Sequence, residues 1–139
     1  MNKSHSCICI NLRQASLAIT RFYDAVLEPS GLKVTQYSAL IAIRQLEPVS
    51  ISGLAENLGL DRTTLGRNLR VLERENLITF SPGQDQREHT VHLTSQARLA
   101  LEVAYPLWEQ AQAKIRQNLG QPQVEMLKTL LADLEATIA

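Results

Sequence analysis

Cysteine is scarce in this sequence, and its scarcity excludes one class of small protein. Cys7 and Cys9 are the only cysteines among 139 residues. Two thiols so close together and so few in number cannot cross-link distant parts of a chain, so a disulfide-stabilised scaffold is excluded. We therefore expect both side chains to be reduced thiols at rest.

Long apolar runs and an excess of charge of one sign are also missing. The apolar runs are far shorter than the roughly 18 to 20 residues that span a bilayer, and no basic segment followed by a hydrophobic stretch opens the chain. We therefore expect a cytoplasmic protein without a membrane partner. Fourteen basic side chains balance fourteen acidic ones, so no global field draws the protein toward nucleic acid. Any DNA-binding surface has to be a local patch.

The residue patterns of common catalytic centres are missing as well. We find no nucleophile motif of hydrolases, no glycine-rich phosphate loop, no pair of catalytic carboxylates and no zinc-hydrolase histidines. His5, Cys7 and Cys9 carry donors that suit zinc or copper(I), but three ligands near a chain end without a fourth make a poor site. We expect no enzymatic activity, no metal and no cofactor.

Aromatic residues make up only 4% of the chain, whereas 45% of the residues are hydrophobic, which indicates a helical core rich in leucine and alanine. Apolar residues at alternating spacings of three and four predict a first helix over 10–27. Thr35 is the expected N-cap of a second helix that ends near Leu46. A long amphipathic helix is predicted from Thr94 to Gly120, and a last helix follows it.

The centre of the chain predicts a helix-turn-helix. Ser52 is the expected N-cap of a short helix that Gly59 ends, and Asp61 caps the next helix, which runs to about Asn76. Two helices separated by a turn of three residues have helix-turn-helix geometry.

The apolar stripes of the first helix and the last two helices exceed what one small domain can cover. Such stripes usually bury against a second copy, which favours a symmetric homodimer. We therefore predict a mainly α fold with a small β wing. A winged helix-turn-helix lobe over about 33–94 lies between dimerisation helices over about 7–28 and 95–139, all in one domain.

The helix after Asp61 separates into two faces when its residues are placed about 100° apart. One side carries Leu65, Leu69, Leu72 and Asn76, and the other carries Thr63, Gly66, Arg67, Arg70 and Arg74. Arginine binds guanine or phosphate, threonine contacts base edges, and glycine removes steric bulk, so the second side predicts a DNA-reading surface. An ordinary solvated face is the alternative, because Glu73 and Glu75 can pair with the arginines.

A predicted β-hairpin follows this helix and forms the wing. The segments 78–80 and 90–93 have strand chemistry and enclose a polar turn. Arg87 follows the Pro-Gly pair of that turn, and Asp85 can orient its guanidinium at the hairpin tip. An arginine held there can enter the minor groove of DNA. A surface ion pair of little energetic weight is the alternative.

Three segments carry a resemblance to a known family: LAENLGLDRTTL at 54–65, LERENLI at 72–78 and DQREHTVHLT at 85–94. Together with the order of helices, they resemble the MarR family of multiple-antibiotic-resistance regulators over nearly the whole chain. The most specific element is the wing, with Asp85, Arg87 two residues later and a closing Leu-Thr pair. The helix-turn-helix alone is shared with many regulator families.

The resemblance implies a DNA-binding repressor that works as a homodimer. Its recognition helices would enter consecutive major grooves of a pseudopalindromic operator, with the wing arginines in flanking minor grooves. By position, the resemblance assigns base reading to Arg62, Thr63, Thr64 and Arg67, a less uniform role to Arg70, and the wing pair to Asp85 and Arg87. Family members are released from double-stranded DNA by an aromatic acid, a metal or thiol oxidation.

The start of the first helix resembles the organic-hydroperoxide-sensing branch of that family. Cys9 lies where the branch has its reactive cysteine, and Tyr23 matches a tyrosine that hydrogen-bonds the sensing thiolate. Arg13 replaces a further tyrosine, but a nearby cation and a helix N-terminus both favour a thiolate. Thiol oxidation at Cys9, with Cys7 as a second candidate, is one hypothesis for the effector. The alternative is that both cysteines have no regulatory role.

A small aromatic ligand is the other effector hypothesis. Tyr23, Tyr37, Tyr105 and Trp108 can line a pocket between the winged lobe and the dimerisation helices, or can simply pack at a helix junction. A winged helix that binds a protein instead of DNA is the rival class of function. The arginine-rich helix face and the wing arginine argue against that rival.

Overall fold

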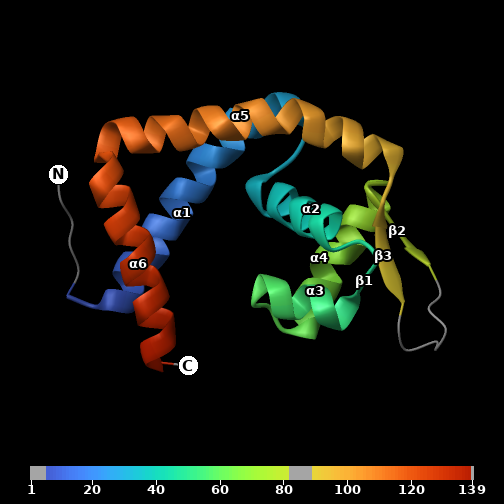
Figure 1. The fold of residues 1–139 in the computed structure, drawn as a ribbon, viewed down its shortest axis with the longest axis horizontal. Coiled ribbons are helices and arrows are strands. Elements are labelled where there is room, and N and C mark those ends of the chain that lie inside the picture. The colour runs from blue at the N-terminus through green and yellow to red at the C-terminus, as the bar shows by residue number, and fades with distance from the viewer. Residues whose placement is uncertain (1–5, 82–88, 139) are drawn as a thin grey trace.

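The computed structural model describes residues 6–81 and 89–138, and this part of the chain is mainly helical with a small β wing (Figure 1). The predicted fold class is therefore confirmed. The helices are α1 (Ile8–Leu27), α2 (Val34–Leu46), α3 (Ile51–Leu58), α4 (Arg62–Arg74), α5 (Ser95–Leu119) and α6 (Gln121–Ile138). A short 3₁₀ turn over Glu28–Ser30 joins α1 to α2, and the strands are β1 (Val49–Ser50), β2 (Ile78–Ser81) and β3 (Thr90–Leu93).

The three strands form one antiparallel sheet in the order β1-β3-β2. Val91 of β3 pairs with Val49 of β1, and Leu93 pairs with Ile78 of β2. All four side chains are buried, so the sheet closes one side of the core and anchors the base of the wing.

The core fills the space between α2, α3, α4, the sheet and the N-terminal half of α5. We call this part of the molecule, from α2 to β3, the winged lobe. Its most deeply buried side chains are aliphatic, as the composition predicts: Leu40, Ile43, Leu54, Leu65, Leu69, Leu72, Ile78, Val91 and Leu101 of α5.

Two of the predicted helix N-caps are wrong by two residues. Lys33, not Thr35, precedes α2, and the N–H of Val34 donates to Asp24 Oδ1 of α1 over 2.8 Å. Ser50, not Ser52, caps α3, because its Oγ accepts the N–H of Gly53 over 3.0 Å. In the first case a contact from a distant helix fixes the start of α2, and no local sequence signal reports such a contact.

The predicted position of Asn76 on the buried side of α4 is also wrong. The helix ends at Arg74, and Asn76 has a left-handed backbone with φ 61° and an exposed side chain. The hydroxyl of Thr94 donates to the Asn76 carbonyl over 2.8 Å. This contact turns the chain out of α4 and toward β2.

Helix α5 crosses the molecule from the wing to α6, and α1 packs against its C-terminal half (Figure 1). We call α1, α6 and the C-terminal part of α5 the helical arm. Many apolar side chains of the arm are exposed: Ile8, Ile10, Leu12, Leu17 and Ile19 of α1, Leu119 of α5, and Met126, Leu127, Leu130, Leu131 and Ile138 of α6. None of the helices in the described ranges combines the length and apolarity needed to cross a bilayer.

Candidate nucleic-acid interface

The turn between α3 and α4 has the tight geometry that the sequence predicts. Gly59 adopts a left-handed backbone with φ 67°, and the N–H of Leu60 donates to the Ala55 carbonyl over 3.0 Å. Asp61 then caps α4, since its Oδ1 accepts the N–H of Thr64 over 2.7 Å. This hydrogen bond lowers the pKa of the Asp61 carboxyl. The two helices are therefore fixed at a turn of three residues.

Helix α4 has one buried face and one exposed face. Leu65, Leu69 and Leu72 are at most 1% exposed and pack into the core. The opposite face carries Thr63, Arg67, Arg70 and Arg74, all exposed, together with half-buried Gly66. Among the described residues no arginine of α4 forms a salt bridge, although Glu73 and Glu75 lie on or beside the same helix. The guanidinium groups are thus available to a polyanion.

Thr63 and Thr64 differ in how their hydroxyls are used. The Thr64 hydroxyl donates to Asp61 Oδ2 over 3.0 Å and helps to cap α4. Thr63 is exposed and makes no hydrogen bond through its hydroxyl within residues 6–81 and 89–138. Arg62, the first residue of α4, is exposed as well. Thr63 therefore has a free donor for a ligand, whereas Thr64 offers a methyl group and an acceptor.

The strands of the wing lie where the sequence predicts them, with β2 one residue longer. Asp85 and Arg87, the predicted wing pair, lie outside the described residues. At the base of the wing, the Thr90 hydroxyl lies 2.9 Å from His92 Nε2. The wing emerges beside α3 and α4 on the same lobe (Figure 1).

A carboxylate that no sequence pattern singles out joins two elements of the winged lobe to α5. Glu47, at the end of α2, accepts the Leu93 N–H of β3 over 3.0 Å and forms a 2.9 Å salt bridge with Arg98 of α5. Burial alone would raise the pKa of Glu47, but these two hydrogen bonds outweigh it and lower the pKa below its ordinary value. Because 51 residues separate Glu47 from Arg98, no short sequence motif signals the pair.

Three of the four aromatic residues predicted to line a ligand pocket pack against one another. Trp108 stacks on Tyr37 and on Tyr105, each with ring centroids 6.0 Å apart. Tyr37 is buried and Tyr105 is 47% exposed. Burial raises the pKa of the Tyr37 phenol. The structure thus brings these rings together as a stack between α2 and α5.

The fourth aromatic residue, Tyr23, lies apart from that stack. Its hydroxyl donates to Gln112 Oε1 of α5, and burial raises the pKa of its phenol, an effect that Arg116 partly opposes. Cys7 is the N-cap of α1 and Cys9 lies in its first turn, and both thiols are free and exposed. With a rise of about 1.5 Å per residue, Tyr23 lies roughly 21 Å along the helix from Cys9. One chain alone therefore cannot form a hydrogen bond between them.

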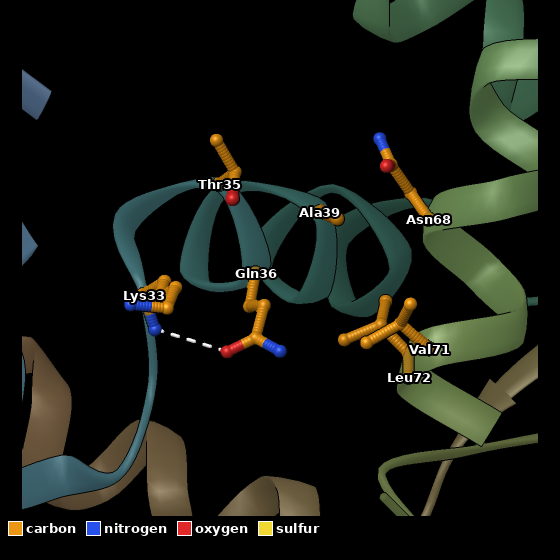
Figure 2. A pocket seen from close by; sticks show the side chains of 7 residues that line it. All are labelled: Lys33, Thr35, Gln36, Ala39, Asn68, Val71 and Leu72. Carbon is orange, nitrogen blue, oxygen red and sulfur yellow. Dashed lines mark hydrogen bonds between the residues drawn. The ribbon is translucent and has the colours of Figure 1, made fainter. Parts of the chain in front are cut away.

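A pocket of about 170 Å³ opens between α2 and α4 (Figure 2). Asn68, Val71 and Leu72 of α4 face Thr35, Gln36 and Ala39 of α2 across it, and Lys33 lies at its edge. Gln36 Oε1 accepts the Lys33 N–H, and its amide nitrogen donates to Glu75 Oε2 over 3.0 Å. No pattern in the sequence indicates this pocket, because its walls come from two separate helices. The pocket lies on the side of α4 opposite Gly66 and Arg70.

A helix-turn-helix with an exposed arginine face, a β wing after it and long framing helices defines the winged-helix class of DNA-binding transcriptional regulators. Comparison with known proteins agrees. The model of the MarR family matches residues 32–89. The crystal structure of the Mycobacterium tuberculosis regulator MosR in complex with DNA is 36% identical, with a TM-score of 0.84, and the match covers 96% of this chain and 98% of that one.

Two curated relatives are also transcriptional regulators. The organic hydroperoxide resistance transcriptional regulator of Bacillus subtilis (strain 168) is 30% identical over 98 residues, which are 70% of this chain and 67% of the relative. The regulator MgrA of Staphylococcus aureus is 28% identical over 128 residues, 89% of this chain and 84% of the relative. The chain belongs to the MarR family.

Proposed function

We propose that the protein is a homodimeric repressor that binds a pseudopalindromic operator through α4 and is released by an effector. The observation that carries the proposal is the exposed face of α4, whose arginines have no acidic partner among the described residues while its opposite face is locked into the core. A helix fixed in this way can enter the major groove without losing existing ion pairs. The relative MosR, solved in complex with DNA, supports double-stranded DNA as the partner.

The apolar surface of the helical arm supports the dimer. Ile8 of α1 is 67% exposed and Leu130 of α6 is 57% exposed, and their apolar neighbours on the same helices are exposed as well. Monomeric proteins rarely expose large apolar patches, so a second copy of this chain is the proposed cover. A twofold axis through the arm would set the spacing of the two α4 helices, which must match half-sites about one turn of DNA apart.

Within this proposal the residues of α4 have distinct tasks. Arg67 and Thr63 lie at the centre of the exposed face and read base edges, while Arg62 and Arg70 flank them and bind bases or phosphates. Thr64 contributes its methyl group, because its hydroxyl is engaged with Asp61. The sequence pattern of Asp85 and Arg87 supports minor-groove binding at the wing.

The test is the affinity of wild type and Arg67→Ala for the DNA upstream of the protein's own gene, measured by fluorescence anisotropy. Loss of one bidentate base contact should weaken binding by about 1 to 3 kcal/mol per half-site. Arg44→Ala, which removes an exposed arginine from α2, is the control and should bind as wild type does. Size-exclusion chromatography must show the same dimer for all three. If Arg67→Ala binds with wild-type affinity, the base-reading surface does not lie on α4.

Two observations support different effectors. The exposed thiols at the start of α1, together with the name of the Bacillus subtilis relative, support an organic hydroperoxide. The exposed Tyr105 ring, stacked on Trp108 near the junction of lobe and arm, supports a small aromatic ligand. The hydroperoxide is the first candidate because Cys9 lies on a helix of the proposed dimer interface, where a new polar group has the greater structural effect.

A further inference from the structure

Gly66 lies in the middle of α4, where helix stability favours almost any other residue. Glycine is the least favourable residue except proline inside a helix, because it loses the most backbone freedom on folding. Its backbone does not have a positive φ. A Cβ built on Gly66 meets no atom within 4 Å. Neither backbone conformation nor packing within the described residues therefore requires glycine at this position.

The other described glycines each have a local reason. Gly31, Gly59 and Gly120 adopt positive φ values, which other residues rarely do. A Cβ on Gly53 would lie 3.2 Å from Ser50 Oγ, the cap of α3. Gly66 is the exception among them, so nothing in residues 6–81 and 89–138 accounts for glycine at this position.

The surroundings of Gly66 on α4 indicate a reason for glycine. Arg62 lies four residues before it and Arg70 four residues after it, so both guanidinium side chains flank it on neighbouring turns. Thr63, with its free hydroxyl, lies three residues before it. Gly66 is thus a gap among exposed hydrogen-bonding side chains, at the half-buried edge of the exposed face of α4.

We propose that Gly66 is a specificity-determining position, at which the α4 backbone closely approaches a base pair and leaves room for the C5-methyl group of a thymine. The inference rests on the proposed function, since it requires α4 to lie in the major groove. All four bases present hydrogen-bonding groups there, which the surrounding arginines and threonine can reach, and only thymine adds a C5-methyl group. The thymine methyl is apolar and projects from the base edge, so it needs space and an apolar Cα surface instead of a donor.

The test compares wild type with Gly66→Ala on the duplex that wild type selects from a randomised library. We expect Gly66→Ala to bind this duplex roughly 10-fold or more weakly, because the added methyl group occupies the space of the base methyl. The Tm should rise by about 3 °C, since alanine favours the helix. Deoxyuridine in place of thymidine, one position at a time in both half-sites, then removes each base methyl. At one position this exchange should restore the affinity of Gly66→Ala to within about 2-fold of wild type on the same duplex.

Gln45→Gly places a glycine at an exposed position of α2, outside both α4 and the helical arm. It should lower the Tm and leave DNA affinity unchanged, which shows that affinity does not follow helix stability. Wild-type affinity in Gly66→Ala would overturn the proposal. So would a loss of affinity that deoxyuridine relieves at no position. Failure of wild type itself to select any sequence would instead refute the proposed function, so the two failures are distinguishable.

Discussion

Adjacent residues of α4 serve different purposes, and the two threonines at its start are the clearest case. The Thr64 hydroxyl belongs to the cap of α4 through Asp61, whereas the Thr63 hydroxyl has no such partner among the described residues. Residue type alone gives both threonines the same prediction. Only the hydrogen bonds distinguish a side chain that maintains the helix from one that is free to contact DNA.

Thr63→Val and Thr64→Val should therefore differ in their effects on DNA affinity. Valine keeps the shape and the methyl group but removes the hydroxyl, so Thr63→Val loses a hydrogen bond to DNA, worth roughly 1 kcal/mol or about a 5-fold weaker affinity. Thr64→Val should change affinity by less than about 2-fold and should instead lower the Tm, because the cap loses one hydrogen bond. Anisotropy titrations and thermal unfolding measure the two effects. If Thr64→Val loses affinity and Thr63→Val does not, the Thr64 hydroxyl is the one that contacts DNA.

At the scale of helices and strands, the sequence predicts the six helices and the two wing strands but misplaces some of their ends. The turn of Gly59 to Asp61 is local, and its residues suffice to predict it. The start of α2 is only partly local: Gln36 Oε1 accepts the Lys33 N–H three residues away, but Asp24 of α1 accepts the Val34 N–H across ten residues. The start of α3 is predicted two residues too late, because the cap is Ser50, the last residue of β1, and not Ser52.

The sequence likewise predicts one part of the candidate DNA-binding site and misses another. Helical periodicity suffices to place Arg67 and Arg70 on the exposed face of α4, since both lie within one regular helix. Periodicity could not show that Tyr37 and Tyr105 both stack on Trp108, because this depends on how α2 and α5 pack. The link from Glu47 to Arg98 was missed for the same reason.

The hydrogen bonds of Glu47 make the stability of the winged lobe depend on pH. The pKa of Glu47 is lowered in the folded protein, so the carboxylate adds stability above its unfolded pKa, and this contribution is lost as the pH falls through the folded pKa. Glu47→Gln should lower the free energy of unfolding by about 1 kcal/mol at pH 7, since the salt bridge is partly solvated and the amide still accepts the Leu93 N–H.

Urea unfolding of wild type and Glu47→Gln at several pH values tests this expectation. The difference between the two proteins should be full at pH 7 and should shrink below the ordinary pKa of about 4.5. Arg98→Gln removes the other partner and should show the same loss at pH 7. If the difference in free energy of unfolding between the two proteins stays constant from pH 7 to pH 3, the charge of Glu47 contributes nothing to stability.

At the scale of the whole molecule, the proposed dimer depends on the exposed apolar face of α6. Leu131→Glu places a charge on that face and should convert the dimer into monomers, because a buried, unpaired carboxylate costs several kcal/mol. Ala136→Glu introduces the same charge on the opposite, exposed side of α6 and is the matched control. Analytical ultracentrifugation reports the mass, and circular dichroism confirms the fold. A dimeric Leu131→Glu protein would place the interface elsewhere.

The proposed response to an oxidant also belongs to the whole molecule, since it links the first turn of α1 to the distance between two α4 helices. A hydroperoxide transfers its terminal oxygen to a thiolate, which becomes a sulfenate while the hydroperoxide becomes an alcohol. Cys9 lies inside α1, among exposed apolar side chains of the proposed dimer face, whereas Cys7 lies at its extended N-cap. A polar sulfenate at Cys9 therefore disturbs the interface more than one at Cys7.

Oxidation of Cys9, more than of Cys7, should accordingly weaken DNA binding, because fixed half-sites tolerate little change in the spacing of the recognition helices. The measurement is a gel shift with stoichiometric cumene hydroperoxide on wild type, Cys7→Ser and Cys9→Ser. Wild type and Cys7→Ser should release DNA, and Cys9→Ser should retain it. Mass spectrometry of the same samples must show one added oxygen, or its disulfide product, at Cys9 in wild type and in Cys7→Ser. If all three proteins release DNA alike, or none does, thiol oxidation at Cys9 is not the signal, and an aromatic ligand becomes the leading explanation of induction.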